Sequence, residues 1–108
     1  MEGMLTPGSL KNKTIIVTGG GTGLGRSMGK YFLELGANLV ITSRKLEVLQ
    51  KTAGEMMKET GGKVLAIACD VRKYEEVENV IRSAENEFGQ VNGILNNAAG
   101  NFISPTER

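Results

Sequence analysis

The sequence predicts an α/β fold in which helices cover both faces of a parallel sheet. Short β-rich apolar segments alternate with longer segments whose apolar residues recur at helical spacing, in the order βαβαβαβ. A glycine-rich segment joins the first strand to the first helix. Because crossovers between parallel strands are right-handed, this alternation indicates a doubly wound sheet.

The first strand is expected at residues 14–17, where β-branched residues predominate. Helical spacing over residues 26–35 predicts the first helix, and Gly36 is suited to follow it as a C′ residue. Residues 38–42 form the second predicted strand. Their consecutive apolar side chains are typical of a strand buried on both faces.

The same alternation continues through the second half of the chain. The remaining elements are expected to be a helix at 45–59 ended by Gly61 and Gly62, a strand at 63–68, a helix at 74–88 ended by Gly89, and a strand at 91–95. A short tail follows Asn101, and no linker or repeat interrupts the pattern. A sheet that ended at the fourth strand would expose an edge, so we expect the front part of a larger domain. A self-contained small α/β domain is the alternative.

The turn after the first strand is the most specific feature of the sequence. It reads Thr18-Gly19-Gly20-Gly21-Thr22-Gly23-Leu24-Gly25. Gly19 permits a sharp turn, Gly23 permits close approach of the backbone to a pyrophosphate, and Gly25 permits close packing of helix on strand. Amide groups at the positive end of the helix would bind the diphosphate. The turn therefore predicts a dinucleotide site, and a flexible glycine-rich loop is the alternative.

The segment after the second strand indicates which dinucleotide is bound. NAD-binding domains usually place an acidic residue here on the ribose hydroxyls. This chain has Ser43, Arg44 and Lys45 instead. An acid would repel a 2′-phosphate, whereas the planar guanidinium of Arg44 can bind it, so we expect NADP rather than NAD. Alternatively, Arg44 and Lys45 are solvated charges at the start of a helix.

Polar residues also follow the third and fourth strands. Asp70, next to Val71, could accept a hydrogen bond from the adenine amino group, could be the N-cap of the third helix, or could do both. The fourth strand ends in Asn96-Asn97-Ala98-Ala99-Gly100-Asn101. Small residues there let the backbone run close to a cofactor, although paired asparagines at a strand end more often form a turn.

Composition excludes several classes of function. Thirteen basic and twelve acidic residues nearly cancel, so no nucleic-acid or membrane-surface partner is indicated. No apolar run approaches the ~20 residues that span a bilayer, and residues 1–10 resemble no targeting segment. Without histidine, Ser-His catalysis and His-containing metal sites are excluded, and no metal is expected. Cys69 is the single cysteine, which fits a reducing cytosol or organelle matrix.

Three motifs together resemble the short-chain dehydrogenase/reductase superfamily, whose fold is a Rossmann-type doubly wound sheet. They are Thr18-Gly19-x-x-x-Gly23-x-Gly25, Asp70-Val71 and Asn96-Asn97-Ala98-x-Gly100, each closing a strand. The extra alanine in Asn-Asn-Ala-Ala-Gly-Asn-Phe is similar to the 2,4-dienoyl-CoA reductases, most of all the mitochondrial type. The resemblance extends from about Leu5 to Arg108. It implies that residues 1–108 are the NADP-binding, N-terminal portion of a larger single-domain reductase.

The resemblance implies NADPH as cofactor, with its pyrophosphate on the glycine turn, its 2′-phosphate on Arg44 and its adenine on Asp70. It also implies that Arg72 and Phe102 touch an acyl-CoA substrate. The residues expected to bind the cofactor are Gly19, Gly20, Gly21, Thr22, Gly23, Leu24, Gly25, Ser43, Arg44, Asp70, Val71, Asn97, Ala98 and Gly100.

In this family, hydride passes from NADPH to the δ carbon of a 2,4-dienoyl thioester. The resulting dienolate is protonated at the α carbon to give a 3-enoyl-CoA, a step auxiliary to fatty-acid β-oxidation. The resemblance further implies a homotetramer in the mitochondrial matrix, with the cytosol as the alternative compartment.

No catalytic residue is expected within the chain. The family's Tyr-x-x-x-Lys pair has no counterpart, because Tyr31 and Tyr74 are followed four residues later by Leu35 and Glu78. The chain alone should therefore be nearly inactive. Two alternatives differ in function: another short-chain carbonyl or enoyl reductase, and a non-catalytic truncated product that binds a nucleotide or a partner chain.

Overall fold

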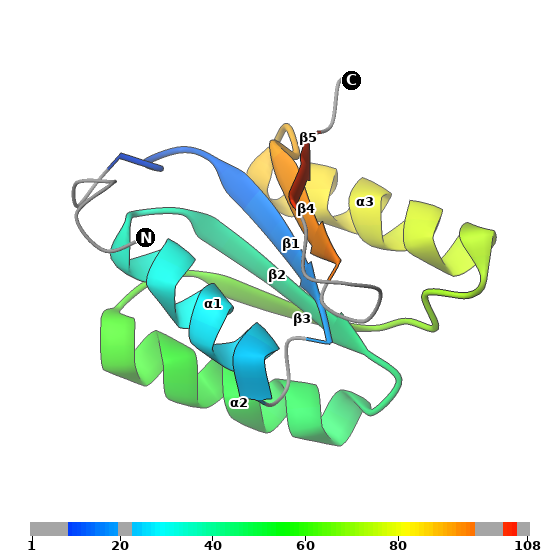
Figure 1. The fold of residues 1–108 in the computed structure, drawn as a ribbon, viewed down its shortest axis with the longest axis horizontal. Helices are drawn as coiled ribbons and strands as arrows, with labels where there is room; N and C mark the ends of the chain where they lie inside the picture. The colour runs from blue at the N-terminus through cyan, green and yellow to red at the C-terminus, as the bar shows by residue number, and fades with distance from the viewer. Residues whose placement is uncertain (1–8, 20–22, 97–102, 106–108) are drawn as a thin grey trace.

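The computed structural model describes residues 9–19, 23–96 and 103–105. Within these residues, strands form one sheet and helices lie against it (Figure 1). The strands are β1 Thr14–Thr18, β2 Asn38–Ser43, β3 Val64–Ala68, β4 Gly93–Asn96 and β5 Ile103–Pro105, and the helices are α1 Gly23–Glu34, α2 Leu46–Thr60 and α3 Tyr74–Phe88.

The strand order in the sheet is β3-β2-β1-β4-β5. Strands β1 to β4 pair in parallel, which confirms the predicted doubly wound α/β sheet. The chain builds outward from β1 through β2 to β3 and then crosses back to place β4 on the other side of β1. The strand order therefore reverses between β1 and β4, and ligands of such sheets bind beyond the carboxyl ends of strands at this point.

Strand β5 was not predicted, because the residues after Asn101 were expected to be a tail. It pairs antiparallel with β4, with Leu95 opposite Ile103 and Gly93 opposite Pro105. The outer edge of β4 is thus covered by a short strand. Pairing of this kind depends on where the chain folds back, and no local pattern encodes it.

The fourth strand was expected at residues 91–95 but begins two residues later, at Gly93. Asn92 explains the difference. Its side-chain oxygen accepts a hydrogen bond from the Thr14 amide at 2.8 Å, and its own amide donates to the Thr14 carbonyl at 2.9 Å. A side chain thus replaces one backbone partner at the start of this strand pair, and regular pairing begins only beyond it.

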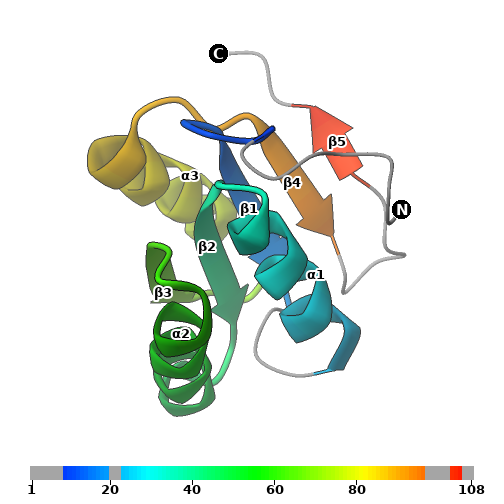
Figure 2. The ribbon, with the colours of Figure 1, turned by 90° about the vertical axis from the view of Figure 1, so that its left-hand side faces the viewer.

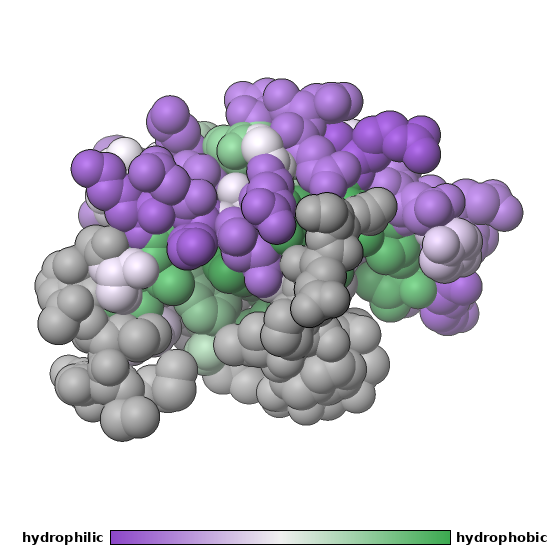
Figure 3. Space-filling model, turned by 90° about the horizontal axis from the view of Figure 1, so that it is seen from above, coloured by the Kyte–Doolittle hydropathy of each residue, from purple (hydrophilic) through white to green (hydrophobic). Residues whose placement is uncertain are grey.

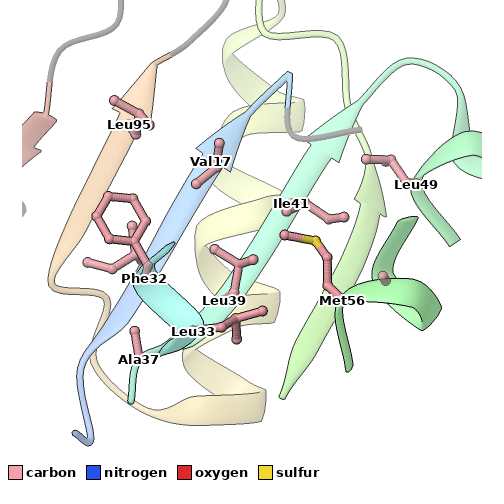
Figure 4. Packing of buried hydrophobic residues seen from close by; sticks show 11 residues of the cluster. Val17, Phe32, Leu33, Ala37, Leu39, Ile41, Leu49, Met56 and Leu95 are labelled. Carbon is pink, nitrogen blue, oxygen red and sulfur yellow. The ribbon is translucent and has the colours of Figure 1, made fainter. Parts of the chain in front are cut away.

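The sheet lies between two helical layers, with α1 and α2 on one face and α3 on the other (Figure 2). Side chains of α1 and α2 pack on Val17, Leu39 and Ile41 from the central strands (Figure 4). The opposite face packs Ile16 and Val40 against α3. Both faces of β1 and β2 are therefore buried, as their continuous apolar sequence predicts.

Helix α1 packs closely on the sheet and on α2 at Gly29. A Cβ atom built on Gly29 would lie 2.8 Å from Cε of Met56 and 2.9 Å from a Cδ atom of Leu39. On the surface, Arg26 of α1 forms an ion pair with Glu55 of α2 at 3.2 Å. These contacts fix the helix whose N-terminus follows the glycine turn.

Seen from above, the described residues on this face are mainly hydrophilic, and hydrophobic residues are visible between the polar ones (Figure 3). None of the helices in the described part of the chain combines the length and the apolar character needed to cross a membrane.

Candidate nucleotide-binding site

A cleft of about 330 Å³ opens at the carboxyl ends of β1, β2 and β3. These ends lie on the same edge of the sheet (Figure 1). The lining residues are Gly19, Ser43, Arg44, Cys69, Asp70, Val71 and Arg72. The structure thus brings together residues from three separate strand ends that the sequence singles out for binding, and it adds Cys69.

Backbone hydrogen bonds hold the three strand ends level with one another. The Gly19 amide donates to the Thr42 carbonyl at 2.7 Å, and the Cys69 amide donates to the Ser43 carbonyl at 2.8 Å. Gly19 has a φ of 68°, in the left-handed region that favours glycine. Gly19 therefore has a backbone conformation that permits the sharp turn expected after β1.

The second strand end contributes a hydroxyl and a cation. The Ser43 hydroxyl accepts a hydrogen bond from the Lys45 amide at 3.2 Å, which orders the turn into α2. Arg44 is exposed and forms no ion pair with another described residue. Arg44 is also one of the residues that line the cleft.

The third strand end carries a carboxylate held by an arginine. Asp70 accepts hydrogen bonds from Nε of Arg72 at 3.0 Å and from Nη2 at 2.9 Å. These bonds hold the pKa of the Asp70 carboxyl well below its usual range, and the positive charge of Arg44 acts in the same direction. Asp70 is therefore ionised and can accept a hydrogen bond from a ligand.

The possible N-cap role of Asp70 is wrong. Helix α3 has Lys73 as its N-cap residue, without a side-chain cap bond. The Asp70 carboxylate instead accepts from the Arg72 amide at 3.0 Å, closing an Asx-type turn before the helix. The aspartate lies too far upstream to reach the helix N-terminus, because residues 70–73 form their own turn, with the Lys73 amide bonded to the Asp70 carbonyl at 2.9 Å.

Cys69 was not among the site residues predicted from the sequence. It lines the cleft and also packs in the cluster under α3, so that only 3% of its surface is exposed. Burial raises the pKa of its thiol. The only sequence signal for it is its place directly after β3.

The glycine turn leads into the N-terminus of α1. Gly23 has a φ of 60°, and a Cβ atom there would meet nothing within 4 Å, so its backbone conformation, not crowding, favours glycine. Gly25 is buried, and Leu24 belongs to the first turn of α1. The predicted cofactor residues Gly20, Gly21, Thr22, Asn97, Ala98 and Gly100, and the predicted substrate residue Phe102, lie outside the described residues.

The chemistry of the cleft fits an anionic nucleotide. Arg44 and Arg72 line the cleft together with Asp70, and Gly19 lines it at the end of β1. Within residues 9–19, 23–96 and 103–105, no cluster of acidic or cysteine side chains could hold a metal ion. The arrangement is suited to binding, and the described part of the cleft supplies no acid–base pair.

Similarity to known proteins extends over nearly the whole chain. An uncharacterized oxidoreductase of Caenorhabditis elegans is 47% identical over 105 residues, which are 96% of this chain and 34% of the relative. The probable 2,4-dienoyl-CoA reductase 3 of the same organism is 43% identical over 106 residues, 97% of this chain and 34% of that protein. The chain thus spans about a third of the length of these relatives.

A solved structure has the same fold. The L-sorbose reductase of Gluconobacter frateurii, complexed with NADPH and L-sorbose, aligns with a TM-score of 0.79 and 30% identity over 83% of this chain and 34% of that one. The sequence model of the short chain dehydrogenase family matches residues 13–108. The chain therefore belongs to the short-chain dehydrogenase family.

Proposed function

We propose that this chain forms the adenosine end of an NADPH site in a reductase of 2,4-dienoyl-CoA thioesters. The proposed cofactor rests on one observation, the cleft that Arg44 and Asp70 both line. No acidic residue directly follows β2, where an NAD-binding domain usually has one. The substrate class is supported by the relative named as a probable 2,4-dienoyl-CoA reductase.

The proposed cofactor residues divide by the part of NADPH that they bind. Backbone amides at the start of α1 would hold the pyrophosphate. Arg44 would bind the 2′-phosphate through its planar fork, and Asp70 would accept from the adenine amino group. Bound NADPH supplies the hydride, while the residues of this chain anchor the adenosine end and so fix where the nicotinamide lies.

The acyl-CoA substrate is proposed to contact Arg72 and Phe102. Arg72 has 74% of its side chain exposed, and its guanidinium could bind a phosphate of coenzyme A. Phe102 is proposed as a further substrate contact. The wider proposal is a homotetramer that acts in β-oxidation of unsaturated fatty acids, in the mitochondrial matrix or alternatively in the cytosol.

Calorimetric titration of this chain with NADPH and, separately, NADH tests the cofactor. We expect micromolar binding of NADPH and binding of NADH weaker by about tenfold or more, because a charge-assisted bond contributes about 1.5–3 kcal/mol. Equal affinities would contradict the role of Arg44. Absence of binding by both would contradict the proposed site.

The substrate is tested with a longer protein that contains this sequence and has the full length of the relatives. We expect NADPH oxidation with a 2,4-dienoyl-CoA and little with simple ketones. The second candidate function is carbonyl reduction, which the likeness to L-sorbose reductase favours. Reduction of ketones without reduction of the dienoyl thioester would replace the first candidate by the second.

A further inference from the structure

We propose that Glu76 is a positioning residue for the adenine end of this site, acting through Asp70. The proposal rests on the proposed function, in which the Asp70 carboxylate accepts a hydrogen bond from the adenine amino group. Glu76 lies in the first turn of α3 and is absent from the lining of the cleft. Its effect on the ligand is therefore indirect.

The contact between Glu76 and Asp70 is short and direct. The Asp70 amide donates a hydrogen bond to Oε1 of Glu76 at 2.8 Å, across six positions of sequence. It joins the turn that lines the cleft to helix α3. That helix is anchored on the sheet by the buried residues Val80 and Ala84. Glu76 thus links the Asp70 backbone to a fixed part of the fold.

The other hydrogen bonds of Asp70 do not attach it to a helix or to the sheet. The side chain is bonded to Arg72, which lies two positions away and is 74% exposed. A bond between two residues of one turn constrains their relative orientation but does not attach the turn to the sheet. Upstream, the turn is attached through the Cys69 amide. Glu76 supplies the attachment at Asp70 itself.

Glu76 also forms an ion pair, whose effect must be distinguished from that of the hydrogen bond to Asp70. Nζ of Lys73 lies 3.7 Å from Oε2, the other carboxylate oxygen, and the two side chains are 65% and 41% exposed. Exposed pairs of this kind contribute little. A glutamine at position 76 would lose the ion pair but keep an oxygen that accepts from the Asp70 amide. Glu76→Gln therefore distinguishes the hydrogen bond from the charge.

The experiment compares NADPH with its analogue that carries hypoxanthine in place of adenine. The analogue has a carbonyl where adenine has its amino group, so it cannot donate to Asp70 from that position. We expect wild-type chain to bind NADPH about tenfold more tightly than the analogue, as for one hydrogen bond to a charged group. In Glu76→Ala this ratio should fall to about twofold, because the carboxylate is no longer held in place.

Two variants serve as controls for this comparison. Glu76→Gln should keep the wild-type ratio. Glu75→Ala removes the same charge from the same helical turn, at an exposed residue outside the cleft lining, and should also keep it. Circular dichroism shows whether each variant folds. If Glu76→Ala does not fold, Glu76→Asp replaces it: the charge stays, the reach shortens, and the ratio should still fall.

The outcomes separate the two proposals. Failure of the wild-type chain to bind either compound contradicts the proposed function. Binding of both with equal affinity contradicts the role of Asp70 and overturns the inference with it. If wild type discriminates and Glu76→Ala discriminates equally well, the inference alone is overturned. An equal loss of affinity for both compounds also overturns it, because it would reveal a purely structural role.

Discussion

Arg44 is the single residue on which the proposed cofactor preference depends. It is an exposed cation in the cleft, and it forms no ion pair with the other described residues. We expect Arg44→Ala to weaken NADPH binding by about ten- to a hundredfold, with little effect on NADH. Calorimetry measures both affinities. Lys45→Ala removes the neighbouring cation, which does not line the cleft, and should leave the preference unchanged.

Asp70 should make the stability of the chain sensitive to acid. Its native pKa lies below the ordinary value, chiefly because of the hydrogen bond from the Arg72 side chain. The ion pair therefore stabilises the fold above the unfolded carboxyl pKa of about 4, and this stabilisation is lost as the pH falls through the lower native pKa. We expect Asp70→Asn to lose less stability than wild type between about pH 4 and pH 2.

Urea unfolding midpoints at a series of pH values measure this difference. Glu75→Gln removes a nearby exposed carboxylate and serves as the control. Parallel pH profiles for wild type and Asp70→Asn would mean that the pair with Arg72 does not stabilise the native state.

Sequence alone identifies much of the cleft, since Gly19, Ser43, Arg44 and Asp70 each follow a predicted strand. Parallel strands end at one edge, so order along the chain is enough to group them. The position of Glu76 is different. Its contact with Asp70 depends on how the chain folds back into α3, and nothing in its local sequence distinguishes it from Glu75.

At the scale of the helices, replacement of glycine by alanine should have opposite effects on stability at two positions. At Gly29 of α1, an added methyl group would press on the buried side chains of Leu39 and Met56. At Gly54 of α2, it would meet nothing within 4 Å. We expect Gly29→Ala to destabilise the fold by about 1 kcal/mol, since overpacking exceeds the gain in helix propensity. Gly54→Ala should stabilise it by about 0.5–1 kcal/mol.

Chemical denaturation of both variants and wild type measures these free energies of unfolding. The substitution is the same in each helix, so each variant is the control for the other. Stabilisation by Gly29→Ala would mean that α1 can move away from the sheet more easily than its packing suggests.

The spacing of apolar residues predicts the helices and the parallel strands. It does not predict the residues at which they begin. Helices α2 and α3 begin after Lys45 and Lys73, neither of which forms a side-chain cap bond, so no capping residue marks either start. The start of β4 depends on the bonds between Asn92 and Thr14. Strand β5 depends on its pairing with β4. These features are set by contacts between distant residues, which local patterns do not contain.

For the molecule as a whole, cofactor binding should raise thermal stability. A ligand that binds only the folded state adds about 2.7 kcal/mol at a hundred times its dissociation constant. For a domain of this size, that corresponds to an increase in Tm on the order of 10 °C. Differential scanning fluorimetry with NADPH measures the shift, and Arg44→Ala should reduce it. An unchanged Tm at saturating NADPH would contradict binding to the native state.

The cleft residues all lie between positions 19 and 72, and the strands that carry them, β3, β2 and β1, are neighbours in the sheet. The described lining residues of this cleft are therefore synthesised before α3 and β4. Because chains grow at about 5–20 residues per second, residue 72 is synthesised seconds before residue 108. Helix α3 covers one face of β1 and β2 and holds the Asp70 amide through Glu76, so the cleft takes its described form only after α3 has been synthesised and packed on the sheet.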